Sequence, residues 1–318
     1  LPISELGAVF ARTLARQAAQ VLRCEIPDII ELGAGSGRLA CDLLTALTAL
    51  DCLPQRYRIL ETSADLRERQ RALLHRELPQ YASRVSWLDA LPAGCEALVI
   101  ANEVLDAMPV HIVKTRADGI DELGVSARDG AFGWSARPAT GAPLGAASEL
   151  KLAPGYTTEI ALAARAFIRT LGAHLARGVA ILIDYGYPAR EYYHPQRYDG
   201  TLMCHYRQHA HADPFCLVGL QDITAHVDFS ALAVAAVESG FDLLGYTNQA
   251  QFLINCGITE VLGATPADHA ASYLPLAAQA QTLMSPAEMG ELFKVIALGR
   301  NFAAPLPGFA SGDKRHTL

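Results

Sequence analysis

The sequence lacks the features that mark several large classes of protein. No apolar run approaches 18 residues without a charge or a turn-forming residue, so no membrane span is expected. There is no basic block and the net charge is −7, which argues against a nucleic-acid partner, because such partners are held mainly by phosphate neutralisation. The seven cysteines are scattered and none forms a CxxC pair. This favours reduced thiols in a reducing compartment such as the cytoplasm over a disulfide framework or a zinc site.

One short histidine-rich run invites a metal interpretation. The segment HYRQHAH contains His205, His209 and His211. No cysteine or carboxylate nearby completes an obvious ligand set, and solvated loop histidines are commoner. We therefore expect no metal site.

The pattern of apolar segments predicts an α/β protein. Helices and strands alternate over residues 5–101, which is typical of a doubly wound parallel sheet with helices on both faces. With a last strand at residues 291–299, antiparallel at the edge, the sheet would have seven strands. With 318 residues and 51% hydrophobic content, we expect one catalytic domain over residues 1–302. Because the chain begins at Leu1 without a methionine, a preceding segment is also expected.

Three insertions and a tail are expected in this domain. Residues 110–150 alternate and turn at two Asp-Gly pairs, which predicts a β-meander, and a helix is expected at 157–176. Residues 187–229 have no clear period and are interpreted as a long active-site loop. Residues 249–289 are predicted to be a helical insertion, and residues 303–318 a loose tail.

A glycine-rich turn follows the first predicted strand, in the sequence DIIELGAGSG. Gly33, Gly35 and Gly37 allow the backbone to approach a ligand where any Cβ would clash, and they leave N–H groups free at the start of the next helix. Dinucleotide-binding spacing would need a glycine in place of Arg38, so a nicotinamide-dependent oxidoreductase is the weakest alternative. The shorter spacing, preceded by Glu31, suits S-adenosylmethionine (AdoMet), whose ammonium a carboxylate can bind. A tight turn that binds nothing is the competing interpretation.

Acidic residues also follow the second and third predicted strands. The ends of strands one and two lie side by side in a doubly wound sheet, so Glu61 is predicted to accept hydrogen bonds from both ribose hydroxyls. Alternatively, Glu61 is a charge at a helix N-terminus that Ser63 caps. Precedent for this fold places Asp89, near the end of strand three, in contact with the adenine, although a plain loop residue would fit as well.

Three polar residues follow the fourth predicted strand, residues 96–101, in the sequence NEVLDAMP. Asn102 is predicted to contact both cofactor and acceptor at this carboxyl end of the sheet. A spacing of three would place Glu103 and Asp106 on one face of a helical turn. Two carboxylates could bind a guanidinium in a fork and orient one nitrogen for attack on a methyl group. A capped helix start with solvent-facing acids is the alternative.

A histidine between acidic residues stands in the later sequence DITAHVDF. His226 is a candidate base or substrate-orienting group. Asp228 is counted with it as a catalytic candidate, or else it caps the helix predicted at residues 230–239.

Seven segments resemble, in order through nearly the whole chain, the bacterial branch of the family that includes the mitochondrial complex I assembly arginine methyltransferase. They are ELGAGSGRLA, YRILETSADLRERQ, ANEVLDAMPV, IDYGY, GTLMCHYRQH, GLQDITAHVDF and MGELFKVIALGR. The resemblance implies a class I, Rossmann-like methyltransferase fold with AdoMet as cofactor. It further implies symmetric dimethylation of a protein arginine. Family members usually carry a further N-terminal segment, rich in Gly and Tyr, that this sequence does not include.

Our leading hypothesis is a cytoplasmic protein-arginine methyltransferase. Its acceptor would be a protein, such as a respiratory-complex subunit, and a homodimer is left open. The alternatives are methyl transfer to a small molecule or another side chain, and a non-catalytic assembly factor that binds AdoMet. The glycine turn with Glu31 and Glu61 argues against an inactive cofactor site.

Overall fold

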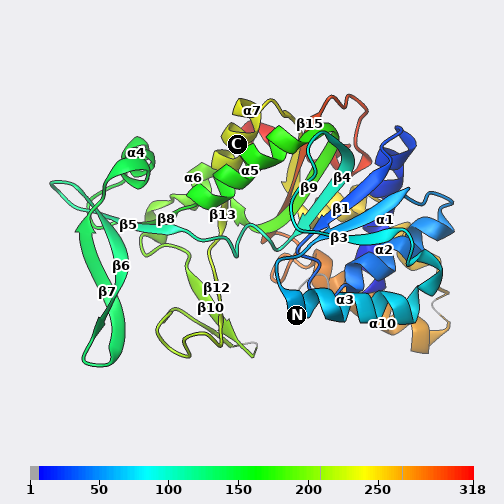
Figure 1. The fold of residues 1–318 in the computed structure, drawn as a ribbon, viewed down its shortest axis with the longest axis horizontal. Coiled ribbons are helices and arrows are strands. Elements are labelled where there is room, and N and C mark those ends of the chain that lie inside the picture. The colour runs from blue at the N-terminus through cyan, green and yellow to red at the C-terminus, as the bar shows by residue number, and fades with distance from the viewer. Residues whose placement is uncertain (1–6, 208, 267) are drawn as a thin grey trace. The chain divides into compact units, whose positions relative to one another are not determined.

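A computed structural model describes residues 7–207, 209–266 and 268–318 (Figure 1). The chain forms two compact units, and each is described by itself. The first unit contains the chain up to Val104, together with Arg169–Tyr185 and Ala236–Leu318. The second contains Leu105–Ile168 and Gly186–Ala235. No helix among the described residues is both long and apolar enough to cross a membrane.

The first unit is built on the predicted doubly wound sheet. Its strand order is β14-β15-β9-β4-β1-β2-β3, with neighbouring strands from β9 to β3 parallel to one another. The bounds are β1 (Asp28–Leu32), β2 (Arg56–Leu60), β3 (Val85–Leu88), β4 (Cys95–Asn102), β9 (Leu175–Tyr187), β14 (Asp242–Asn248) and β15 (Phe293–Arg300). The fold class is therefore confirmed. The edge position predicted for the last strand is wrong, because β15 pairs antiparallel with both β9 and β14 and leaves β14 at the edge.

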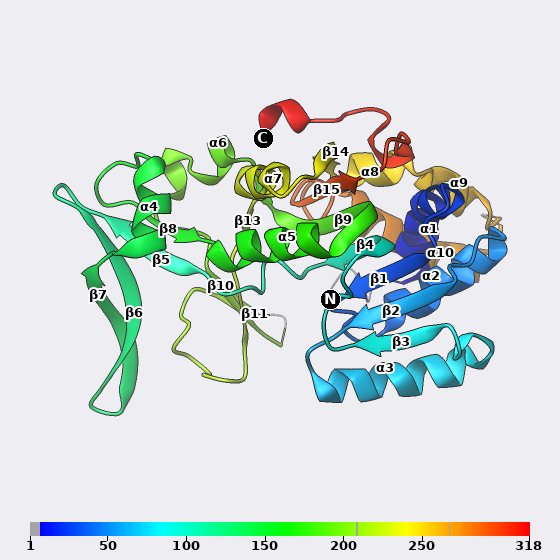
Figure 2. The same ribbon diagram turned by 45° about the horizontal axis from the view of Figure 1, so that its top comes forward.

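Helices of the first unit bury one apolar face each against this sheet or against one another. In α1, Val9, Leu14, Ala18 and Val21 are fully buried at helical spacing, as expected for an amphipathic helix. Figures 1 and 2 show α3 running beside β3. The bounds are α1 (Ala8–Arg23), α2 (Arg38–Ala49), α3 (Ala64–Glu77), the 3-10 turn η2 (Pro79–Tyr81), α8 (Gln249–Asn255), α9 (Ile258–Gly263) and α10 (Ala270–Met284). The last three are the helices predicted within residues 249–289; that this segment is an insertion stays a prediction.

The C-terminal segment is not the loose tail that the sequence suggested. It contains the 3-10 turns η4 (Pro307–Phe309) and η5 (Arg315–Thr317). Phe309 packs against Phe252 with ring centroids 5.4 Å apart, and the amide of Gly308 donates to Gln17 Oε1 at 2.9 Å. Buried apolar side chains and backbone hydrogen bonds thus hold this segment against α1 and α8.

In the second unit, residues 111–138 form a β-meander, whereas residues 141–149 of the range predicted to be a meander form a helix. An antiparallel sheet has the order β7-β6-β5-β8. Its strands are β5 (His111–Thr115), β6 (Ile120–Arg128), β7 (Ala131–Pro138) and β8 (Thr157–Ile160), and α4 (Gly141–Glu149) follows β7. Asp129 and Gly130 have φ of 52° and 79°, as a two-residue hairpin turn requires. Figure 1 shows β6 and β7 as a long hairpin. The helix expected from residue 157 starts later, as α5 (Leu162–His174), because residues 157–160 pair with β5.

The expected long loop is more ordered than the sequence indicated. It contains α6 (Ala189–Tyr192), η3 (Pro195–Arg197), β10 (Met203–Tyr206), β11 (His209–His211), β12 (Asp222–Thr224) and β13 (Val227–Asp228), and α7 (Phe229–Glu238) follows. Strands β11, β10 and β12 form a small antiparallel sheet. The carboxylate of Glu159 organises the segment by accepting hydrogen bonds from the amides of Thr201 and Leu202 and from the Tyr192 hydroxyl. The ordering depends on these distant partners, which leave no periodic signal in the sequence.

Candidate functional site

The glycine turn lies in the first unit, between β1 and α2. Gly33, Gly35 and Gly37 all have positive φ, at 62°, 53° and 84°, a region that favours glycine. A Cβ on Gly33 would lie 3.1 Å from Val104 Cγ2, so the turn also packs closely on its neighbours. The amide of Gly33 donates to the carbonyl of Leu60 at 3.0 Å, which ties the turn to the end of β2.

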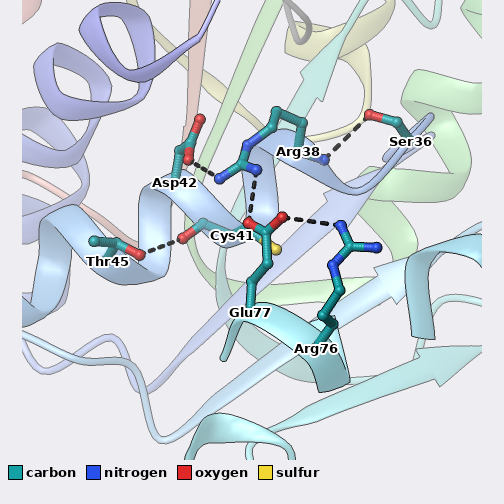
Figure 3. Close-up of polar contacts among 7 residues, drawn as sticks. All are labelled: Ser36, Arg38, Cys41, Asp42, Thr45, Arg76 and Glu77. Carbon is teal, nitrogen blue, oxygen red and sulfur yellow. Dashed lines mark hydrogen bonds and ion pairs between the residues drawn. The ribbon is translucent and has the colours of Figure 1, made fainter. Parts of the chain in front are cut away.

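Arg38 occupies the position where dinucleotide-binding turns have glycine. Its side chain forms ion pairs within α2 and with α3 (Figure 3). Its guanidinium donates to Asp42 on its own helix and to Glu77 at 2.7 Å, at the end of α3. Its backbone amide donates to Ser36 Oγ at 3.3 Å. The side chain thus joins α2 to α3 behind the turn.

The two acids predicted to hold the cofactor are both buried. Glu31 is 3% exposed and accepts a hydrogen bond from the Tyr57 hydroxyl at 2.7 Å. Burial raises the pKa of Glu31 to about 7, against a smaller lowering by Tyr57, and the charge of Glu61 raises it further. Glu61 is 6% exposed and accepts from the amide of Ser63 at 3.0 Å. Ser63 itself caps α3 by accepting from the amide of Leu66, the cap named in the alternative interpretation of Glu61.

Gln70 links the turn to Glu61 and was not among the residues predicted from the sequence. This side chain is fully buried on α3, and its amide nitrogen donates to the carbonyl of Gly35 at 2.8 Å and to Glu61 Oε2 at 3.2 Å. Its oxygen accepts from the Trp87 indole at 2.8 Å. Leu66 and Leu74 lie four residues away on either side, so the spacing alone placed Gln70 on the apolar face of the helix. A polar residue on that face was the available signal.

Asp89 differs from the other predicted cofactor residues because its side chain is 92% exposed. It pairs with Arg67 at 2.7 Å, and Arg67 also donates to the carbonyls of Glu61 and Leu88. Arg67 therefore connects the ends of β2 and β3. An adenine contact by Asp89 stays a prediction.

At the end of β4, the structure departs from the expected helical turn. Glu103 has φ of 53°, and its amide donates to the carbonyl of Ile183 at 3.0 Å. The amide of Val104 donates to Asp184 Oδ2 at 3.2 Å. These bonds to β9 replace helical ones, so the helical spacing predicted for Glu103 and Asp106 is wrong. Asn102 is 8% exposed and donates to Glu103 Oε1 at 3.3 Å, whereas its buried Oδ1 accepts no hydrogen bond from any described residue.

The other three catalytic candidates lie in the second unit. Asp106 is 4% exposed, and its carbonyl accepts from the amide of Ala225 at 3.0 Å, which brings it close to His226 along the chain. The His226 ring packs edge-on against Tyr187, with centroids 5.3 Å apart. Asp228 caps α7 by accepting from the amide of Ala231, and it accepts from the Tyr193 hydroxyl at 2.8 Å. Burial raises the pKa of Asp228. The capping interpretation of Asp228 is confirmed.

The three histidines of the HYRQHAH run lie on strands β10 and β11. Across the described ranges, no group of three or more His, Cys, Asp or Glu side chains is placed to hold a metal ion. The seven cysteines are all free thiols, and burial raises the pKa of Cys41 and Cys256 to about 12, which makes them unreactive.

The chain is similar to known proteins over most of its length. The model of a family described as S-adenosyl-L-methionine-dependent methyltransferases matches residues 6–247. Two curated relatives are each named protein arginine methyltransferase NDUFAF7 homolog, mitochondrial. The one from Drosophila melanogaster is 27% identical over 306 residues, and the one from Caenorhabditis elegans is 25% identical over 260 residues. These alignments cover 85% and 73% of this chain and 67% and 58% of the relatives.

Two solved structures match the whole fold. A COG1565 superfamily member from Burkholderia thailandensis, bound to S-adenosyl-homocysteine, is 52% identical with a TM-score of 0.96. The match covers 100% of this chain and 83% of that one. A native structure of a protein of the same superfamily and organism is also 52% identical, with a TM-score of 0.96 over 99% of this chain and 85% of that one.

Proposed function

Because the chain belongs to the family of AdoMet-dependent methyltransferases, we propose that it methylates arginine side chains of a protein. The enzyme class follows from the family. The arginine acceptor is supported by the names of the insect and nematode relatives, of which this chain spans about two thirds or less. It is also supported by the carboxylate of Glu103, whose charge suits a guanidinium.

The observation that carries the cofactor part of this proposal is the set of contacts around the glycine turn. Glu31 and Glu61 are buried at the ends of neighbouring parallel strands, and Gln70 bonds both Glu61 and the turn. Two buried acids beside a turn whose three glycines all have positive φ fit a ligand with an ammonium group and a ribose. The Burkholderia relative holds such a ligand, S-adenosyl-homocysteine (AdoHcy). We assign the ammonium to Glu31, the ribose hydroxyls to Glu61 and the close backbone contact to Gly33, Gly35 and Gly37.

The residues of the chain mainly bind and orient the reactants. AdoMet supplies a methyl group on a positively charged sulfur. The buried acceptor atom Asn102 Oδ1 is assigned to an N–H group of cofactor or substrate. Glu103 is assigned to the guanidinium, which stays charged at neutral pH and therefore pairs with a carboxylate. After attack the nitrogen must lose a proton, and His226 is the candidate base. A respiratory-complex subunit as acceptor, and a homodimer, stay predictions.

Isotope labelling tests the acceptor. The purified protein is incubated with methyl-labelled AdoMet and a lysate of cells that lack it, and the modified residues are mapped by mass spectrometry. We expect label on arginine, with none when AdoHcy is added in excess. Label on lysine, nucleic acid or a metabolite, without any on arginine, would overturn the acceptor and favour one of the alternatives.

A pH effect on cofactor binding is expected from the raised pKa of Glu31. A carboxylate binds an ammonium only when ionised, so affinity for AdoHcy should rise by about tenfold between pH 6 and 8, as expected for a pKa near 7. The Tyr57 hydrogen bond lowers this pKa, so Tyr57→Phe should move the midpoint to higher pH. Calorimetric titration across this range measures both effects.

The control is Glu31→Gln, which keeps the shape but cannot ionise. Any pH dependence that remains in this variant comes from the ligand, and subtracting it isolates the effect of Glu31. The sign is opposite for stability of the free protein. Between pH 4.5 and about 7, Glu31 binds its proton more tightly in the folded state than in the unfolded state. The contribution of Glu31 to the free energy of unfolding therefore decreases as the pH rises through that range. If the AdoHcy affinity of the unmodified protein depends on pH in the same way as that of Glu31→Gln, then Glu31 does not bind the ammonium.

A further inference from the structure

Gln70 is fully buried in the first unit, where α3 packs against the glycine turn. The approach is close, because a Cβ on Gly37 would lie 3.2 Å from Gln70 Cγ and 3.4 Å from its Cα. An apolar side chain of similar size would fill this position at a lower desolvation cost than an amide does. Packing therefore does not require a glutamine here, and the reason for it lies in its hydrogen bonds.

The orientation of the Gln70 amide is fixed by Trp87. An indole N–H can only donate, so the Gln70 atom that it meets at 2.8 Å is the oxygen. The Gln70 nitrogen then faces the Gly35 carbonyl at 2.8 Å and Glu61 Oε2 at 3.2 Å. A carbonyl and a carboxylate both accept, so both amide hydrogens are used. The reverse orientation would place the amide oxygen against two acceptors and leave the indole N–H without one.

The Glu61 carboxylate receives one of these bonds on each of its two oxygens. The Ser63 amide donates to Oε1 at 3.0 Å, and Gln70 donates to Oε2. An ionised carboxylate has about four acceptor positions, so about two remain for a ligand. The two hydroxyls of a ribose lie on adjacent carbons and can donate to the two oxygens of one carboxylate. The orientation of the carboxylate plane therefore decides whether both hydroxyls bind.

We propose that Gln70, held by Trp87, is a positioning residue that orients the Glu61 carboxylate toward the two ribose hydroxyls of the cofactor. This inference rests on the proposed function in assigning the ribose to Glu61. It adds that selectivity for the ribose depends on a residue that acts through Glu61. Loss of the Gln70 amide should weaken binding of a ligand with both hydroxyls more than binding of the same ligand without them.

Calorimetric titration with two ligands measures this selectivity. The ligands are AdoHcy and an AdoHcy analogue that lacks both ribose hydroxyls, and the unmodified protein should bind AdoHcy at least about 30-fold more tightly. Gln70→Met keeps the length of the side chain but has no amide, and the preference for AdoHcy should fall by about tenfold. This variant also loses the bond to Gly35, which weakens binding of both ligands alike. The ratio of the two affinities is therefore the quantity to compare.

Two further variants show whether Gln70 acts through Glu61. Trp87→Phe removes the indole donor and leaves the Gln70 amide free to turn its oxygen toward Glu61, so the preference for AdoHcy should fall by about threefold or more. Glu61→Gln should lose most of the preference by itself. Adding Gln70→Met to Glu61→Gln should then change the preference by less than about twofold, because coupled residues are not additive.

Gln17 provides the matched control. It is also fully buried on a helix of the first unit, where it donates to Gln20 at 3.1 Å and accepts from the Gly308 amide at 2.9 Å. Gln17→Met removes an equally buried amide, so it should lower the temperature of thermal unfolding about as much as Gln70→Met does. Its preference for AdoHcy over the analogue should match that of the unmodified protein.

Three results would overturn the inference. One is an unreduced preference in Gln70→Met, or in Trp87→Phe where Gln70→Met does not fold, while Glu61→Gln has lost it. Another is a further tenfold loss when Gln70→Met is added to Glu61→Gln, because Gln70 would then act independently of Glu61. The third is an unreduced preference in Glu61→Gln, which would overturn the ribose assignment as well. Failure of the arginine acceptor looks different: the labelling experiment would find another acceptor, and the ligand preferences would be unchanged.

Discussion

Glu103→Gln and Asp106→Asn, made one at a time, should each lower the rate of arginine methylation by about 100-fold or more, while AdoHcy still binds with nearly unchanged affinity. Each replacement keeps the size of the side chain and much of its hydrogen bonding but removes a negative charge. In the proposed function, that charge is the partner of the guanidinium and helps to hold one nitrogen ready for attack. The rate of methylation is measured by the formation of methylated peptide, and the affinity for AdoHcy is measured separately by calorimetric titration.

Glu149→Gln is the control for this experiment, because it removes a carboxylate from the exposed end of α4 in the second unit. Its rate should match the unmodified protein. Should Glu103→Gln and Asp106→Asn methylate arginine at the unmodified rate, neither carboxylate binds the acceptor. If the variants instead lose AdoHcy affinity in parallel with rate, their role is on the cofactor side.

Gly35→Val should weaken AdoHcy binding by at least about 100-fold and abolish methyl transfer with it. Gly35 has φ of 53°, a conformation that a β-branched residue adopts only under strain. Its carbonyl is also held by Gln70, which bonds Glu61 as well, so a distorted turn would displace the acid assigned to the ribose. Calorimetry with AdoHcy measures the loss.

Gly94→Val separates backbone strain from loss of the site. Gly94 also has positive φ, at 64°, and lies in the same unit just before β4. Apart from its chain neighbours, no described residue has a heavy atom within 4 Å of the place that a Cβ on Gly94 would take. The two variants should lose similar stability in thermal unfolding, and only Gly35→Val should lose the ligand. Unchanged AdoHcy affinity in a folded Gly35→Val protein would show that the turn does not contact the ligand.

Much of the architecture could be predicted because its signals are local. The buried parallel strands are short, nearly continuous apolar runs. Helix α1 before them and helix α2 between β1 and β2 have the residue spacing of an amphipathic helix. The β-meander was predicted from alternation and from the Asp129-Gly130 turn. The position of β15 was not predictable in the same way, because nothing in a strand's own residues states which neighbours it pairs with. The order found at residues 187–229 depends likewise on Glu159, which lies far away in the sequence.

The sequence by itself determined the glycine turn and the acids within β1 and directly after β2, because each depends on residue type at a fixed place along a strand. The enzyme family was indicated by the resemblance of seven segments to known methyltransferases. Only the tertiary structure decided what surrounds them. Glu103 and Asp106 do not have helical spacing, because the backbone amides of residues 103 and 104 bond to β9 and not within a helical turn. The bond of Tyr57 to Glu31 follows from the register of two parallel strands, and the contact of Trp134 with Phe215 joins segments about 80 residues apart. Contacts of this kind are set by packing, which minimises exposed apolar surface over the whole unit and leaves no local pattern in the chain.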